Sequence, residues 1–264
     1  MKPATSIEKV CRVLNEFRDR PCMGVTDLAR RTDLLPSDIH RILASLKSFG
    51  FVEQNPETKT YRLGVALLKL GLTVFQRNEL SGAARPLLLR LSQELESTAH
   101  LAIFDRKELD IFLAEQIDYS KEVPFKAKFG APAGAHCTAL GKAIMADQDA
   151  ETISLYLQKH GMKKSTHYTI THMKEFSAAL AQTQAQGYGL DLEEYVEGAC
   201  CLGASIRDWT GNTVGAISIS MVARRFYSLP ERDIAAMVKA TAAQVSHEIG
   251  FKPHIVDKAL VTHS

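Results

Sequence analysis

The sequence predicts an α+β protein with an N-terminal winged helix-turn-helix domain, a linker helix, and a C-terminal domain of helices packed on an antiparallel sheet. Three observations lead to this class. The 264 residues exceed one typical domain, and 45% hydrophobic residues suffice for two cores. Residues 24–64 follow the order helix, turn, helix, hairpin, and beyond residue 86 helical patterns mix with short strands. We therefore expect domains at 1–63 and 83–254, a linker at 64–82, and a flexible tail at 255–264.

The N-terminal domain is delimited by its capping and turn residues. Thr5 followed by Glu8 makes a capping box, so we expect a first helix up to about residue 18. A second helix is expected at 25–31, and the break at 34–37 precedes a third helix that ends at Gly50, a C′ residue. Strands at 51–54 and 60–63 then flank a turn. This hairpin is the predicted wing.

The third helix has one apolar face and one polar face. Apolar residues at i, i+3, i+4 and i+7 turn inward, and these are Ile39, Ile42, Leu43 and Leu46. Short polar side chains and one arginine point outward, and these are Ser37, Asp38, His40, Arg41 and Ser45. Such side chains suit a helix that lies in the major groove of DNA. Ordinary helix packing produces the same pattern, so the residues alone leave both interpretations open.

The charge distribution favours a polyanionic partner for the N-terminal part. Residues 1–80 hold 13 Lys and Arg against 9 Asp and Glu, a balance of +4, and the remainder holds 19 against 21, a balance of −2. We expect further DNA contacts on the second helix and the wing, with the basic side chains at phosphates or acting only as solubility charges. These candidates are Thr26, Arg30, Lys59, Tyr61 and Arg62.

Several other classes of protein are not favoured by the sequence. No apolar run approaches the roughly 18 residues that span a bilayer, and the first residues lack a signal-peptide core, so we expect a cytoplasmic protein with no membrane partner. The glycine-rich nucleotide motifs and the zinc-protease motif are absent, so we predict no enzyme and no cofactor. Five cysteines in no disulfide-framework spacing suit a reducing compartment.

After the wing, the sequence predicts a linker helix and then a mixed domain. The helix at 65–77 has more apolar residues than one globular side needs, which predicts that it pairs with its copy in a second subunit; they are Leu67, Leu68, Leu70, Leu72, Val74 and Phe75. Further helices are expected at 86–97, with Pro86 in the first turn, and at 139–146, 150–160, 172–186 and 230–249. Strands are expected at 100–104, 110–115, 189–193, 201–206 and 213–221.

Several segments resemble one family. Residues 134–143 (GAHCTALGKA), 187–194 (GYGLDLEE) and 198–208 (GACCLGASIRD) resemble the effector domain of IclR-type bacterial transcription regulators. Residues 37–43 (SDIHRIL), 50–52 and 61–64 resemble that family's recognition helix and wing. The resemblance implies a winged helix, a dimerising linker helix and a GAF-like effector domain, assembled as a homodimer or homotetramer. It also implies a repressor or activator that binds double-stranded operator DNA and a small-molecule effector.

The family's effector site carries over to Asp191, Cys201, Ser218, Ser220 and the backbone of Ala139 and Leu140. Unpaired N–H groups at a helix start favour a carboxylate, and residues two apart on a strand face the same side. Asp191 either accepts a hydrogen bond from a ligand hydroxyl or protonated amine, or caps a turn by holding neighbouring amides. Phe125 is a candidate apolar wall, and Ala133 and Ala199 are small where related pockets carry bulky residues. We therefore expect an organic or aromatic acid larger than a two-carbon acid.

A thiol or zinc sensor is the rival interpretation. His136, Cys137 and the vicinal pair Cys200–Cys201 are the candidate nucleophiles or ligands. Cys137 at a helix start is placed to have a lowered pKa, although a small buried cysteine is the commoner explanation. None of the spacings is a CxxC, so we predict no metal site.

Overall fold

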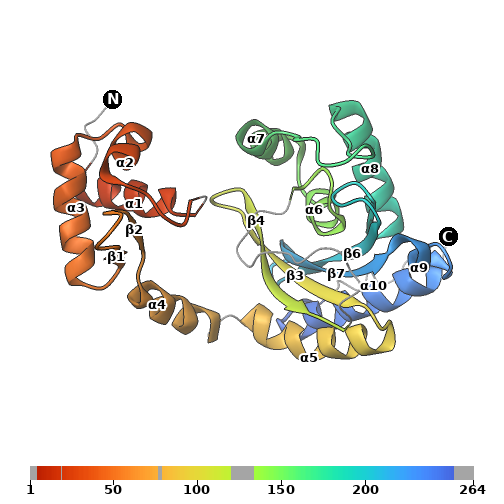
Figure 1. Ribbon diagram of the computed structural model, residues 1–264. Coiled ribbons are helices and arrows are strands. Elements are labelled where there is room, and N and C mark those ends of the chain that lie inside the picture. Colours follow the sequence, from red (N-terminus) through yellow and green to blue (C-terminus); the bar gives the residue numbers. More distant parts are fainter. Residues whose placement is uncertain (1–4, 19, 77–78, 120–133, 253–264) are drawn as a thin grey trace, which may run out of the picture. The chain divides into compact units, whose positions relative to one another are not determined.

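The computed structural model describes residues 5–18, 20–76, 79–119 and 134–252, and the chain divides into two compact units, Met1–Asn78 and Glu79–Ser264 (Figure 1). Phe125, Ala133 and the tail predicted at 255–264 lie outside the described residues. The elements of the first unit are α1 (Ser6–Glu16), α2 (Val25–Thr32), α3 (Pro36–Ser48), β1 (Val52–Gln54), β2 (Tyr61–Leu63) and α4 (Val65–Gln76). The predicted helix, turn, helix, wing order is confirmed.

The local signals of the first unit are present as predicted. The Thr5 hydroxyl accepts from the Glu8 N–H at 3.2 Å, and the Glu8 carboxylate accepts from the Thr5 N–H, which completes the capping box. Gly50 follows α3 with a positive φ of 72°, which glycine adopts without a steric cost. The four apolar residues predicted to face inward from α3 are all buried, together with Leu28 of α2 and Val52 of the wing.

Helix α4 leaves most of its apolar side chains in solvent. Val65, Leu68, Leu70, Leu72 and Val74 are between 48% and 69% exposed. An isolated amphipathic helix of this length gains most of its stability from packing. The exposed leucines therefore indicate a surface that is uncovered in the single chain.

The second unit is built on a five-stranded antiparallel sheet with the strand order β4-β3-β7-β6-β5. Its strands are β3 (Thr98–Asp105), β4 (Asp110–Ile117), β5 (Gly189–Leu192), β6 (Ala199–Arg207) and β7 (Thr213–Val222). Its helices are α5 (Glu79–Glu94), α6 (Ala139–Met145), α7 (Ala150–His160), α8 (Met173–Gln186), α9 (Ala223–Phe226) and α10 (Glu231–Glu248). The predicted α+β class and antiparallel sheet are confirmed.

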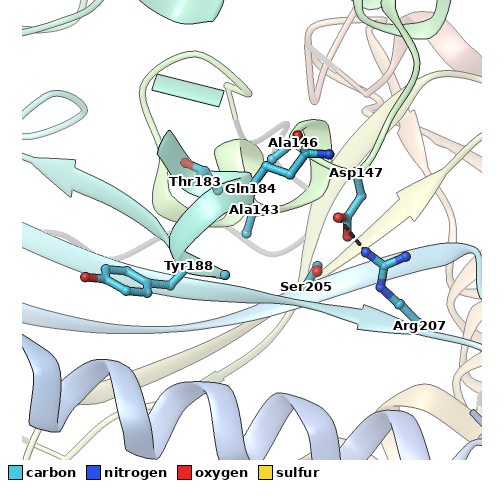
Figure 2. Close-up of a pocket in the computed structure, with 9 residues that line it drawn as sticks. Ala143, Ala146, Asp147, Thr183, Gln184, Tyr188, Ser205 and Arg207 are labelled. Atoms are coloured by element: carbon cyan, nitrogen blue, oxygen red, sulfur yellow. Dashed lines mark hydrogen bonds and ion pairs between the residues drawn. The ribbon is translucent and has the colours of Figure 1, made fainter. Parts of the chain in front are cut away.

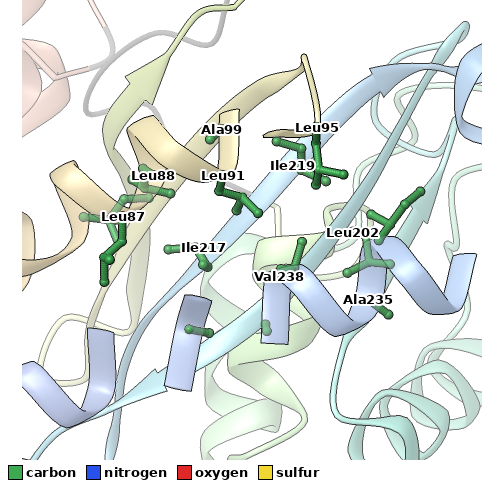
Figure 3. Close-up of a cluster of buried hydrophobic side chains, with 14 of the residues drawn as sticks. Leu87, Leu88, Leu91, Leu95, Ala99, Leu202, Ile217, Ile219, Ala235 and Val238 are labelled. Atoms are coloured by element: carbon green, nitrogen blue, oxygen red, sulfur yellow. The ribbon is translucent and has the colours of Figure 1, made fainter. Parts of the chain in front are cut away.

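Helices cover both faces of this sheet (Figure 1). Helices α5 and α10 pack on one face, where Leu88, Leu91, Ile217 and Val238 form the larger core (Figure 3). Helices α6, α7 and α8 lie on the other face, where Tyr156 and Phe176 pack with Ala102 and Ala216. Because side chains alternate along a strand, each strand sends every second residue toward α6.

One sequence-based prediction about a helix was wrong, and one helix was not predicted. Helix α5 begins at Glu79, so Pro86 lies inside it and not in its first turn. The first turns form because Leu80, Ser81 and Ala84 are buried against the sheet, and this packing outweighs the hydrogen bond that proline cannot donate. The short helix α9, which directly follows β7, was not predicted. Its Ala223 and Phe226 are buried in the larger core.

Candidate functional site

The outer face of α3 is the candidate DNA-reading surface of the first unit. Ser37, His40, Arg41 and Ser45 are exposed on it, and Thr26 is exposed on α2. The Arg41 side chain is 75% exposed, and its guanidinium contacts the Asp38 carboxylate at 3.2 Å. This ion pair joins residues three apart on the helix surface and is weak when solvated. This contact therefore leaves the Arg41 guanidinium accessible.

From the sequence we expect Asp38 to point outward, but in the structure its side chain is largely covered. Only 20% of its side chain is exposed, and its carboxylate accepts from the Lys9 ammonium of α1 at 2.8 Å. This hydrogen bond, helped by the charges of Lys9 and Arg41, holds the pKa of Asp38 below its usual value. The Asp38 carboxylate therefore links α1 to α3, and Lys9 and Arg41 balance its charge.

The basic residues predicted to contact DNA lie at the surface. Arg30 pairs with Asp27 at 2.9 Å, and Arg62 pairs with Glu53 across the wing at 2.8 Å. Lys59 stands in the wing turn with a positive φ of 58°. The Asn55 side chain supports this turn by accepting the N–H groups of residues 57 and 58 at 2.9 and 3.1 Å.

Tyr61 does not fit the set of DNA-contacting residues. It is 8% exposed and belongs to the core of the first unit, where its N–H and C=O pair with Met23. Of the three residues of β2, only Tyr61 is buried, and the neighbouring Arg62 is exposed. Contact between Tyr61 and DNA therefore stays a prediction, and the burial of the ring does not favour it.

The residues predicted for the effector site meet on the face of the sheet that is covered by α6. The register places Asp191 of β5 opposite Cys201 of β6, and Cys201 opposite Ser220 of β7. Ser218 lies two residues earlier on the same face. We call Asp191, Cys201, Ser218 and Ser220 the polar cluster. All four side chains are buried or largely buried.

Two glycines allow the start of α6 to approach this part of the sheet. A Cβ atom on Gly189 would stand 2.6 Å from the Ala139 carbonyl oxygen, and one on Gly203 would stand 3.1 Å from the Ala139 carbonyl carbon. Gly203 is the cross-strand neighbour of Ser218. Thr138 caps the helix by accepting from the Gly141 N–H at 3.0 Å. Ala139 and Leu140 are thus held beside the polar cluster.

Asp191 caps a turn inside the protein. Its Oδ1 accepts from the N–H groups of Glu194 at 2.8 Å and Tyr195 at 3.3 Å. Burial, followed by the charge of Glu194, raises the pKa of Asp191 to about 7, although these hydrogen bonds and the charge of Lys142 act in the opposite direction. At neutral pH the carboxyl group is therefore present in both protonation states. A protonated Asp191 does not repel an anionic ligand.

A hydrogen-bonded chain links the strands of the cluster. The Cys201 sulfur lies 3.0 Å from the Ser220 hydroxyl, which lies 3.3 Å from Nδ1 of His100 on β3. Beside it, the buried Lys142 of α6 pairs with Glu194 and donates to the Leu190 carbonyl at 2.7 Å. His100, Lys142 and Glu194 were not predicted from the sequence. Alternation with Thr98 could have placed His100 on this face, but nothing local indicated its partner.

The cysteine side chains do not lie together as a thiol or zinc sensor would require. Cys200 points into the core under α10, whereas Cys201 points toward α6, because adjacent strand residues face opposite sides. Burial, together with the nearby charges of Asp191 and Glu194, raises the pKa of Cys137 to about 12. The His136 ring is instead directed to the Lys163 carbonyl at 3.0 Å. Among the described residues, no three metal-ligating side chains come together.

A cavity of about 310 Å³ lies between α6, α8 and β6 (Figure 2). Ala143, Thr183, Tyr188 and Ser205 lie around it. An ion pair closes one end, with Arg207 and Asp147 2.6 Å apart, and the second oxygen of Asp147 accepts from Thr213 at 2.7 Å. These charged groups satisfy one another. The residues of the polar cluster do not line this cavity.

No helix in the described part of the chain combines the length and the apolar character that crossing a bilayer requires.

Comparisons with known proteins agree with this architecture. A family model described as bacterial transcriptional regulator IclR C-terminal matches residues 72–247, and one described as IclR helix-turn-helix domain matches residues 6–56. The chain is 29% identical to the HTH-type transcriptional regulator KdgR of Escherichia coli (strain K12), over 94% of this chain and 93% of the relative. It is 28% identical to the transcriptional repressor IclR of the same strain, over 86% and 83%.

A solved structure shares the fold over nearly the whole chain. An IclR homolog complexed with 4-hydroxybenzoate, from Microbacterium hydrocarbonoxydans, superposes with a TM-score of 0.75 over 93% of this chain and 99% of that chain, at 22% identity. The two family models together span the winged helix and the sheet domain that carries the polar cluster. The chain therefore belongs to the IclR family of bacterial transcriptional regulators.

Proposed function

We propose that a small organic or aromatic acid binds at the polar cluster and controls the binding of this helix-turn-helix regulator to its operator DNA. The observation that carries the proposal is the meeting of Asp191, Cys201, Ser218 and Ser220 directly beneath the start of α6. Buried polar side chains are costly unless they are paired or serve a ligand. The 4-hydroxybenzoate held by a structural neighbour supports an aromatic acid as one ligand class.

The chemistry of the cluster suits a carboxylate. The serine hydroxyls donate to an anion, and first-turn amides such as those of Ala139 and Leu140 have no partner within their helix. Asp191 is compatible with an anion because burial raises its pKa to about 7. Its protonated form can donate to the ligand, and its ionised form can accept from a ligand hydroxyl.

The proposed control of DNA binding by the acid involves a dimer of the chain. On α4, Leu67, Leu70 and Val74 lie on one side of the helix, and Val65, Leu68 and Leu72 lie on the opposite side, given 100° per residue. Both sets have the 3,4 spacing of a coiled-coil seam. We propose that α4 pairs with its copy in a homodimer through the seam of Leu67, Leu70 and Val74 and that the opposite stripe serves a homotetramer.

Such a dimer would read a pseudo-palindromic operator with two copies of α3. Effector binding in the second unit then shifts the equilibrium between arrangements of the two winged helices. The coupling free energy of such linked sites is typically about 1 to 3 kcal/mol.

The test compares two serine variants by calorimetry. A thermal-shift screen of small carboxylic and aromatic acids, 4-hydroxybenzoate included, first identifies the acid that raises the melting temperature most. Ser218→Ala combined with Ser220→Ala removes two donors to a charged group, each worth about 1.5 to 3 kcal/mol, so affinity for that acid should fall at least tenfold. Operator binding without acid should stay unchanged.

Ser205→Ala is the matched control. Ser205 lies on the same face of β6 but lines the cavity of Figure 2. This variant should bind the acid as the unaltered chain does. The reverse result, with affinity lost in Ser205→Ala and kept in the double variant, would move the effector site to that cavity and refute the proposal.

A further inference from the structure

Two cations share one carboxylate at the start of α3. Oδ2 of Asp38 accepts from the Lys9 ammonium of α1 at 2.8 Å, and Oδ1 accepts from the Arg41 guanidinium of α3 at 3.2 Å. The hydrogen bond from Lys9 lowers the pKa of Asp38, so the carboxylate is charged at neutral pH. Lys9 and Asp38 stand 29 residues apart in the sequence, and the folding of the first unit brings them together.

The two ion pairs differ in their exposure to solvent. Lys9 and Asp38 are 29% and 20% exposed, whereas the Arg41 side chain is 75% exposed. Salt and water screen a partly covered pair less than a solvated one. The pair of Asp38 with Arg41 is an exposed contact between residues three apart on a helix, which is weak. Lys9 therefore holds the carboxylate more firmly than Arg41 does.

Loss of Lys9 would leave the Asp38 carboxylate to Arg41. A guanidinium and a carboxylate can form two parallel hydrogen bonds, which fix both groups in one orientation. An arginine reads guanine with the same pair of donors. A guanidinium that is held by Asp38 in this way therefore has fewer donors to offer to a base edge.

We propose that Lys9 is a positioning residue for DNA recognition, which holds Asp38 so that Arg41 stays available to the operator. The inference goes beyond the proposed control by an acid and rests on the proposed function in one respect, that α3 reads the operator. Lys9 lies on α1, outside the helix-turn-helix and the wing, and was not predicted from the sequence to serve DNA binding.

The experiment measures DNA affinity by fluorescence anisotropy on the full chain without acid. One duplex is enriched from random-sequence DNA by the unaltered chain, and the other is a random duplex of the same length. Lys9→Met keeps the length of the side chain but removes its charge and its donors. The ratio of the two affinities should fall about threefold to fivefold, as expected when an exposed ion pair captures Arg41. Lys9→Arg keeps the charge and should preserve the ratio.

A second substitution separates this role from a merely structural one. Lys9→Met combined with Asp38→Asn should restore the ratio to within about twofold of the unaltered value, because no carboxylate is left to capture Arg41. In an Arg41→Ala background, Lys9→Met should leave the ratio unchanged. Asp38→Asn alone should keep the ratio, and this variant keeps the test valid if Lys9→Met fails to fold, since a fall would show that Asp38 itself contacts DNA and would overturn the inference.

Arg31→Met is the matched control. Arg31 of α2 pairs with Glu16 of α1, and their side chains are 33% and 22% exposed, so this variant removes a similar ion pair between two helices of the same unit. Its free energy of unfolding in urea should fall as that of Lys9→Met does, but the ratio of DNA affinities should stay unchanged. A fall in the ratio for Arg31→Met as large as that for Lys9→Met would assign the effect to stability and overturn the inference.

Two further results would overturn it. An unchanged ratio in Lys9→Met would show that Arg41 does not need Lys9. Equal losses on both duplexes, with a salt slope lower by about one, would show that Lys9 contacts a phosphate directly. Failure of the proposed function differs, because acid binding at the polar cluster plays no part in these measurements.

Discussion

Ala139 rests directly on Gly189, because a Cβ atom on Gly189 would stand 2.6 Å from the Ala139 carbonyl oxygen and 3.0 Å from the Ala143 nitrogen. Both of those atoms belong to the backbone of α6 and cannot rotate away. Any side chain at position 189 therefore has to lift α6 from the sheet. The close contact holds the start of the helix beside Asp191, which lies two residues further along β5.

Gly189→Ala should accordingly lower the free energy of unfolding by about 1 to 3 kcal/mol, the usual cost of overpacking. The affinity for the acid should also fall, because the alanine displaces α6. This fall in affinity should exceed what the lower free energy of unfolding explains by itself. Urea denaturation and calorimetry measure the two effects. Gly82→Ala is the control, since nothing lies within 4 Å of its Cβ and alanine in a helix gains about 0.5 to 1 kcal/mol over glycine. Equal stability of the two variants would contradict the packing argument.

Asp191 should make stability depend on pH. Its pKa rises from 3.8 to about 7 on folding, so the folded protein holds the proton more tightly than the unfolded chain. The resulting contribution to the free energy of unfolding is fully present below pH 3.8 and is lost as the pH rises through about 7. Asp191→Asn keeps the acceptor oxygen of the turn but does not titrate. Between pH 5 and 8 the free energy of unfolding of the unaltered chain should therefore fall by about 2 kcal/mol relative to that of this variant.

Urea titrations at each pH provide the measurement, and parallel curves for the two proteins would show that Asp191 does not titrate in this range. The same variant reports on the ligand. If Asp191→Asn strengthens the binding of a simple acid at pH 8, then the ionised carboxylate repels that acid. If it weakens binding, then Asp191 accepts a hydrogen bond from a ligand hydroxyl or amine.

Arg41 and Lys59 should affect DNA binding differently. Arg41→Ala removes an exposed side chain from the outer face of α3 and should cost about 1 to 3 kcal/mol on the operator with relaxed sequence preference. Lys59→Ala in the wing should weaken all sequences alike and reduce the salt slope by about one. Lys107→Ala removes the same charge from an exposed turn of the second unit and serves as the control. Equal losses of Arg41→Ala on operator and random DNA would refute base reading.

The seam proposed on α4 can be tested without disturbing a core. Leu70 and Val74 are 55% and 69% exposed in the single chain, so Leu70→Lys combined with Val74→Lys should leave the melting temperature of the second unit unchanged. Light scattering should show monomers at micromolar concentration, and operator affinity should fall with the loss of two-fold symmetry. Lys69→Ala, on the same helix, should remain oligomeric. A monomeric unaltered chain that keeps its operator affinity would exclude the proposed pairing.

The local sequence was sufficient to predict those elements that depend only on neighbouring residues. The capping box at Thr5 and Glu8, the apolar stripe of α3 and the positive φ of Gly50 each depend on neighbours within one or two turns. These three features follow from spacing along the chain, which is what a sequence records. The positions Asp191, Ser218 and Ser220 came instead from the family resemblance, and the sheet register shows that both serines lie on one face.

Tertiary structure decided the features that depend on residues distant in sequence. The Asp38 side chain is largely covered because Lys9, 29 residues earlier, binds it, and Pro86 stays inside α5 because Leu80 and Ala84 are buried against the sheet. His100 joins the polar cluster because β7, 120 residues further on, pairs with β3. The pKa of Asp191 near 7 arises from burial beneath α6, which no local pattern shows. Desolvation and ion pairing depend on distance in space, and only the folded chain brings these groups together.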